Sequence, residues 1–352
     1  MRMTTQLTPD RVAPPTVATP PPEMMLMQML MGRTISFALG AIAKTGVADH
    51  MSMEAQPVAE IARKASVRQD MLYRVLRMLA SVGMFHQEGD RFALTASSSL
   101  LRRDAPGSMR NMAMMLTSEW ITDAFQQLDG TLLNGVDGVT LAYGKNTWEL
   151  FPTIPDQADL FQKAMTDFTL SATQAVLHAY DFSSIRKLAD VGGGYGTLLA
   201  GILKHHPAMQ GVLFDLPEVV AGAKNAGLFQ GCEDRVAYQA GSFLETAPEG
   251  CDAYILKHII HDWDDAHCGR ILNAIRDRMP ADGRVLLVEM VVPEGPEPGP
   301  AKMLDIEMMA ATVGGKERTS QEFEDLFASA GLRLERIVPT PSPMCVLEAH
   351  RA

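Results

Sequence analysis

Residues 190–196 read Asp-Val-Gly-Gly-Gly-Tyr-Gly and complete the apolar run 187–191, which is typical of a buried strand. Glycines directly after a strand permit a tight turn and the close approach of a ligand to the next helix N-terminus. The G-x-G-x-G spacing differs from the dinucleotide fingerprint G-x-G-x-x-G, and no G-x-x-x-x-G-K-[ST] phosphate loop occurs. The stretch therefore predicts a strand, a turn and a helix that bind a ligand other than a dinucleotide.

The sequence that follows continues this alternation of strands and helices. Apolar runs predict strands at 187–191, 211–214, 236–240, 253–256, 284–290, 332–338 and 345–349, and amphipathic runs predict helices at 197–206, 217–226, 266–279 and 322–330. This order predicts an α/β, Rossmann-like domain over 183–352, with a mostly parallel sheet and helices on both faces.

The first half of the chain has a different, helical texture. The Pro- and Thr-rich tail 1–22 is expected to be disordered, and 23–50 forms a long apolar helical run that suits a partner chain. Within 54–100 we expect a helix, a turn, a second helix and a hairpin, which is the winged-helix pattern. The domain 23–105 is followed by a helical connector over 106–182, with a Gly-rich loop region at 130–145 and a long helix at 159–180.

Composition limits the classes of function. The 352 residues suit two domains, and the net charge of −11 is unfavourable for bulk nucleic-acid or anionic-membrane binding. The winged-helix pattern raises a DNA-binding regulator as an alternative, yet residues 54–110 carry nine Lys/Arg against six Asp/Glu, a weak basic footprint. No uncharged apolar stretch of about 18 residues occurs. The four cysteines form no CxxC pair, so the simplest location is the reducing cytoplasm.

Two further stretches lie at the ends of predicted strands, where ligands bind in open α/β sheets. Asp215 ends the second strand, 19 residues after Gly196, and such an acid can accept both hydroxyls of a ribose. The stretch 257–268 reads KHIIHDWDDAHC. Its histidines and aspartates leave a metal site open as an alternative, although Asp264 or Asp265 also suits the N-cap of the next helix.

These stretches together resemble class I S-adenosylmethionine-dependent methyltransferases, and more narrowly the caffeate/hydroxyindole-type small-molecule O-methyltransferases of bacterial secondary metabolism. The matching strings are DVGGGYG (190–196), FDLPEVV (214–220), KHIIHDWDDAHC (257–268), VEMVVP (288–293), GGKERTSQEFEDLFASAGL (314–332) and FQKAM (161–165). The resemblance implies a seven-stranded sheet with an antiparallel last strand, and an N-terminal domain that makes a homodimer rather than binding DNA.

The resemblance also implies roles for individual residues. His261 would be the catalytic base, braced by Glu289 and Glu317. The residues implied in binding S-adenosyl-L-methionine are Gly192, Gly194, Gly196, Asp215, Leu216, Ser242, Phe243, Lys257, Thr169 and Trp263. Phe161, Met165 and Met308 would shape the acceptor pocket. The family often has Asp where this chain has Ser242, and a serine binds the adenine amine less strongly than a carboxylate does.

The expected reaction moves a methyl group to a hydroxyl of a small aromatic metabolite, such as a phenolic or polyketide-like compound, and releases S-adenosyl-L-homocysteine. No metal is expected in this chemistry, and neither a nucleic acid nor a membrane is an expected partner. The alternatives are a winged-helix regulator with a ligand-sensing C-terminal domain, or a relative that kept the cofactor but carries out N-methylation, decarboxylation or a pericyclic step.

Overall fold

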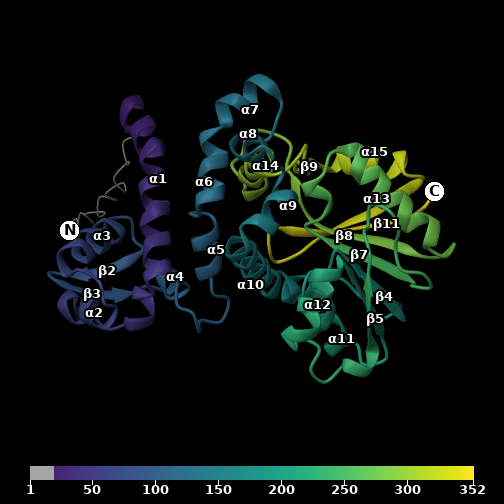
Figure 1. The fold of residues 1–352 in the computed structure, drawn as a ribbon, viewed down its shortest axis with the longest axis horizontal. Coiled ribbons are helices and arrows are strands. Elements are labelled where there is room, and N and C mark those ends of the chain that lie inside the picture. Colours follow the sequence, from purple (N-terminus) through teal and green to yellow (C-terminus); the bar gives the residue numbers. More distant parts are fainter. Residues whose placement is uncertain (1–19) are drawn as a thin grey trace, which may run out of the picture.

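The computed structural model describes residues 20–352 and shows an N-terminal unit, a middle group of helices and a large sheet domain (Figure 1). The expected disorder of the tail falls almost entirely on residues 1–19, outside the described part. The helix expected at 23–50 is α1 (Pro22–Thr45), which ends at Gly46 with φ 68°, before the 3₁₀ turn η1 (Val47–His50).

The N-terminal unit has the expected order of a helix pair followed by a hairpin. Its further elements are α2 (Val58–Lys64), α3 (Gln69–Ser81), α4 (Ala96–Ser99), and the strands β1 (Gln56–Pro57), β2 (Phe85–Glu88) and β3 (Arg91–Leu94). Its core buries the apolar faces of α2 and α3 with the C-terminal end of α1. The rest of α1 is exposed, and by length and composition alone this helix also meets the criteria for a membrane span.

The middle helices lie between the two units in Figure 1. They are α5 (Arg110–Met115), α6 (Glu119–Gln126), α7 (Leu128–Asn134), α8 (Gly138–Tyr143), α9 (Thr147–Leu150), the turn η2 (Phe151–Thr153) and α10 (Pro155–Ala179). The prediction of a loop region at 130–145 is wrong, because α7 and α8 occupy most of it. A β-carbon at Gly138 would meet the backbone of Ala124, so this glycine allows α8 to pack closely on α6.

The sheet confirms the predicted fold class, with the order β10-β11-β8-β7-β4-β5-β6 and β9 beside β8. The strands are β4 (Lys187–Val191), β5 (Gln210–Asp215), β6 (Val236–Ala240), β7 (Ala253–Lys257), β8 (Arg284–Val292), β9 (Arg318–Thr319), β10 (Leu332–Pro339) and β11 (Met344–Arg351). Pairing is parallel except that β11 runs antiparallel to both β8 and β10.

Helices cover both faces of this sheet. They are α11 (Thr197–His205), α12 (Pro217–Ala226), α13 (Asp265–Arg278), α14 (Pro300–Ala311) and α15 (Ser320–Ser329), with the turns η3 (Glu233–Arg235) and η4 (Ile260–Asp262). Neighbouring strand residues face opposite cores: Leu188 packs with α10 and α11, and Ala189 belongs to the core that α13 and α15 cover. The carboxyl ends of β4, β5, β7 and β8 then meet at one edge of the sheet.

Candidate active site

His261 lies on η4, just past the carboxyl end of β7, and its side chain is buried. Its Nδ1 is 2.6 Å from Oε1 of Glu317. When the Glu317 carboxylate accepts the Nδ1 proton, the other ring nitrogen, Nε2, is left to accept a proton from a ligand. Burial, with a further contribution from Asp305, raises the pKa of the Glu317 carboxyl to about 8. Above about pH 8 this carboxyl is ionised, and its buried negative charge then favours the formation of a cation beside it.

Glu289 acts mainly on the backbone of the same loop. Its Oε1 accepts hydrogen bonds from the amides of Ile259 at 3.1 Å and Ile260 at 3.0 Å, while its Oε2 lies 4.0 Å from Nδ1 of His261. Burial raises the pKa of Glu289 to about 7. The structure therefore brings the three expected catalytic residues together, but Glu317 holds the imidazole and Glu289 holds the turn that carries it.

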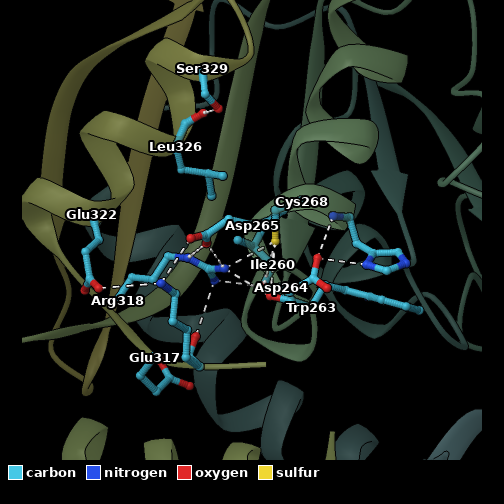
Figure 2. A network of polar contacts seen from close by, with 12 residues as sticks. Ile260, Trp263, Asp264, Asp265, Cys268, Glu317, Arg318, Glu322, Leu326 and Ser329 are labelled. Carbon is cyan, nitrogen blue, oxygen red and sulfur yellow. Dashed lines mark hydrogen bonds and ion pairs between the residues drawn. The ribbon is translucent and has the colours of Figure 1, made fainter. Parts of the chain in front are cut away.

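Arg318 anchors the segment on both sides of His261, a contribution that sequence reasoning missed (Figure 2). Its guanidinium donates to the carbonyls of Ile260 and Trp263, at 3.0 Å each, and to the Asp265 carboxylate at 2.7 Å. The side chain is fully buried. Because Glu317 is its neighbour in sequence, adjacent residues at β9 position both the imidazole and its backbone.

Two neighbours of His261 in the KHIIHDW stretch received no role from the sequence. Asp262 Oδ1 lies 3.5 Å from Nε2 of His261, and burial raises the pKa of Asp262 to about 6. The ring of His258 meets that of His261 edge-to-face at 4.4 Å, and its backbone has φ 53°, a strained value for a residue with a β-carbon. Burial lowers the pKa of His258 well below its usual value, so it stays neutral beside the base.

The metal alternative has a geometric counterpart in the same place. Ligand atoms of His258, His261 and Glu289 lie within 4.8 Å of one another. However, His258 Nε2 contacts Met344 Sδ at 3.0 Å, His261 Nδ1 is bonded to Glu317, and one Glu289 oxygen already accepts two amides. The same atoms are thus held in a protein hydrogen-bond network that suits a base.

The glycine turn has room for a ligand. Gly192 and Gly194 have φ 69° and 58°, and a β-carbon at Gly192 would lie 2.6 Å from the Ile259 side chain. The nearest atom to a β-carbon placed on Gly194 would be 3.8 Å away, so that side of the turn is open. Asp215 accepts the amides of Gly194 at 2.8 Å and Leu216 at 2.7 Å, which fixes the turn beside the strand end.

A buried acid at the end of β4 adds to the fit. Asp190 Oδ2 has no hydrogen-bond partner in the described structure, and burial raises the pKa of this carboxyl to about 7. The nearby Lys257 acts in the opposite direction. An open glycine turn with an orphaned carboxylate oxygen suits a polar ligand that brings its own donors.

The other residues expected at the cofactor lie around this turn. Phe243 is 3.2 Å from the position of a β-carbon on Gly192 and meets Trp263 edge-to-face at 6.1 Å. Lys257 lies 5.9 Å above the ring of Phe168, next to Thr169 on α10. The Thr169 hydroxyl donates to the Met165 carbonyl at 2.6 Å and is therefore engaged within its own helix. Gly196 begins α11, and Ser242 caps its own turn by accepting the amide of Leu244 at 3.3 Å.

The expected acceptor residues lie in an aromatic cluster. Phe161 and Met165, both on α10, pack against one apolar cluster with Trp120 and the end of α14, and Met308 is buried on α14. Trp148 stacks on Trp263 at 6.4 Å and 17° and meets Phe161 edge-to-face at 6.1 Å. Trp120 and Trp148 were missed, although the chain has only three tryptophans and all join this cluster.

Known proteins match this chain over most of its length, and they belong to the family that the sequence resembles. The model of an O-methyltransferase domain matches residues 125–333, and that of an O-methyltransferase dimerisation domain matches 27–104. The phenazine O-methyltransferase PhzM of Lysobacter antibioticus is 37% identical over 94% of this chain and 96% of its own. The mitomycin biosynthesis 6-O-methyltransferase of Streptomyces lavendulae is 32% identical over 99% and 100%. The structure of CalO1, a methyltransferase in calicheamicin biosynthesis with S-adenosylhomocysteine bound, superposes with a TM-score of 0.83 at 35% identity, over 94% of this chain and 98% of that one.

Proposed function

This chain belongs to the O-methyltransferases that carry an N-terminal dimerisation domain and use S-adenosylmethionine, and we propose that His261 removes the proton from a hydroxyl of a small aromatic acceptor. The observation that carries the proposal is the 2.6 Å contact between His261 Nδ1 and Glu317. With Glu317 ionised, the contact selects the tautomer in which Nε2 accepts a proton, at a buried position beside the acceptor cluster.

The chemistry divides between cofactor and protein. S-adenosylmethionine supplies a methyl group that is already activated on a sulfonium. The glycine turn, Asp215 and the pair Phe243 and Trp263 would hold it. Removing a proton from a phenol with free imidazole is uphill by about 5 kcal/mol. Once ionised, the buried Glu317 carboxylate lowers this free-energy cost because it stabilises the imidazolium that forms. Positioning the acceptor supplies roughly 7–11 kcal/mol more.

The acceptor class is supported by the wall of the pocket and by a relative. Aromatic rings and a methionine side chain bury planar acceptors through offset and edge contacts. The Lysobacter relative is named for a phenazine, a fused aromatic. A hydroxylated aromatic of one to three rings is therefore the acceptor class that we propose.

The N-terminal domain completes the proposal. Residues 27–104 match a dimerisation domain, and we propose that they form a homodimer, with no nucleic acid as a partner. The helix-and-hairpin order that suggested a DNA-binding regulator is accounted for by this match.

Methyl transfer to a panel of naphthols and hydroxylated polycycles, followed with a labelled methyl donor, tests the reaction. We expect S-adenosylhomocysteine to bind in calorimetry and NAD to give no heat. Tight NAD binding, or transfer to no aromatic hydroxyl in the panel, would contradict the proposal.

A further inference from the structure

Glu307 is a half-buried residue with one enclosed carboxyl oxygen, and the mechanism above leaves it unused. It lies on α14, its Oε1 is enclosed, and no donor in the described structure is bonded to that oxygen. Burial alone raises the pKa of this carboxyl to about 7. An enclosed acid without a partner is costly, so its presence calls for a reason.

Among the described residues, the elements packed against α14 place no free cation beside this carboxyl. The helices packed most extensively against α14 are α6, α7 and α8, and their sequences contain no Lys, Arg or His. Lys302, on α14 itself, donates to the carbonyls of Gly295 and Glu297. Arg284, on the adjacent β8, is paired with Glu348 at 3.4 Å. The described side chains therefore leave the donor to come from a ligand.

The position of Glu307 on its helix places it at the acceptor cluster. Ala310 and Ala311, one turn further along α14, belong to the cluster that holds Phe161 and Met165. At the end of α14, Thr312 lies against the backbone of the catalytic loop, because a β-carbon on Gly315 would meet both the Thr312 side chain and the His261 carbonyl. Thr312 follows Glu307 by five residues, which corresponds to about 7.5 Å along the helix axis.

We propose that Glu307 binds a nitrogen group of the acceptor, so that the preferred substrate is a hydroxylated aromatic that also carries a protonated amine or a ring N–H. This inference rests on the proposed function, since it adds a second anchoring point to the same pocket. His261 would receive the hydroxyl, and Glu307 the nitrogen at the other end of the ring system. Burying the carboxylate without a partner is unfavourable. A bound acceptor that carries a charged donor offsets this cost by forming a charge-assisted hydrogen bond with it.

The test compares two acceptors of equal shape, an aminomethyl-naphthol and the ethyl-naphthol substituted at the same position, over several ring positions. Binding of each to the S-adenosylhomocysteine complex is measured by calorimetry, and methyl transfer to each is measured separately. The variants are Glu307→Leu, which keeps volume without a charge, and Glu307→Gln, which is the milder change if the first fails to fold. Glu297→Gln, at an exposed acid just before α14, is the matched control for net charge.

For the best ring position we expect the wild type to bind the amine about 10- to 100-fold more tightly than the ethyl compound. Glu307→Leu should abolish this preference, Glu307→Gln should reduce it, and Glu297→Gln should keep it. An unchanged ratio in both Glu307 variants, or no preference for any amine in the wild type, would overturn the inference. Methyl transfer to the ethyl-naphthols tests the proposed function independently, because those acceptors need no partner at Glu307.

Discussion

At the scale of single residues, the site depends on one short contact between a buried imidazole and a buried carboxylate, from His261 to Glu317. We expect His261→Ala to lower kcat by about 10²–10⁴-fold while the affinity for S-adenosylhomocysteine stays near wild type, because general-base catalysis contributes about that much. Steady-state kinetics and calorimetry measure the two quantities.

A nitrophenol that is already ionised at neutral pH is the control acceptor for this variant, because it needs no base. His261→Ala should lower kcat for this acceptor much less than it lowers kcat for an ordinary phenol. Equal losses for both acceptors would mean that His261 positions the substrate without taking its proton. Glu317→Gln should lower kcat more than Glu289→Gln does, because only Glu317 is hydrogen-bonded to the ring. The losses in kcat should not add when the substitutions are combined.

Glu307 gives a prediction about stability and pH. Its folded-state pKa is raised to about 7 from an ordinary 4.5, so the folded protein keeps a proton that the unfolded chain releases. The stabilising contribution is fully present below pH 4.5 and is lost as the pH rises through 7. Relative to wild type, Glu307→Gln should therefore gain up to about 3 kcal/mol between pH 5 and pH 8. Urea midpoints of the wild type and the variant at pH 5 and pH 8 measure this gain. A difference in stability between the two proteins that shrinks as the pH rises would contradict the prediction.

Much of the residue-level site could be predicted, because its motifs are contiguous in sequence and adjoin predictable strand ends. Asp215 is such a case, whereas the roles of His261 and Glu317 followed from the resemblance to the methyltransferase family. Glu307 and Trp148 could not be found in this way, since their roles depend on which helices pack together. An acid in an amphipathic helix reads as a solvated residue until its neighbours are known.

At the scale of elements, β9 holds the catalytic loop and the start of α13 through Arg318. Replacing Arg318 with Met keeps the apolar stem but leaves the carbonyls of Ile260 and Trp263 with only the weak thiol donor of Cys268. Each lost partner of a buried group costs about 1–3 kcal/mol. We expect the urea midpoint to fall and kcat to fall further than the affinity for S-adenosylhomocysteine. Arg318→Lys should recover part of kcat, and a kcat equal to wild type in Arg318→Met would show that the loop needs no such anchor.

The elements of the sheet domain were predictable because strand and helix periods alternate there with clear turn residues. The helices α7, α8 and α14 were missed for physical reasons. Gly130 and Gly138 suggested a loop, but a β-carbon on either would press against a neighbouring helix, so they serve close packing. The proline-rich run 293–300 obscured the start of α14, where Pro300 occupies the first helical turn.

At the scale of the whole molecule, the N-terminal half of α1 is an apolar surface that the described part of the chain leaves largely uncovered. Met29 and Leu30 are 74% and 65% exposed, and Met24, Leu26, Met27 and Met31 are also exposed. A helix of 24 residues is about 36 Å long, enough for two copies to bury a surface of the size found in stable dimers. The match of residues 27–104 to a dimerisation domain points to a second copy of this chain as the cover.

We therefore expect the full-length protein to sediment as a dimer at micromolar concentration, and Met29→Glu combined with Leu30→Glu to shift it to monomer. Two charges buried in an apolar interface would cost more than such a contact can offset. Glu324→Gln with Asp325→Asn, on the distant helix α15, is the control that changes charge without touching α1. Sedimentation velocity over a hundredfold range of concentration separates the cases. A wild-type monomer throughout that range would refute the dimer, and a charged variant that stayed dimeric would place the interface elsewhere on the molecule.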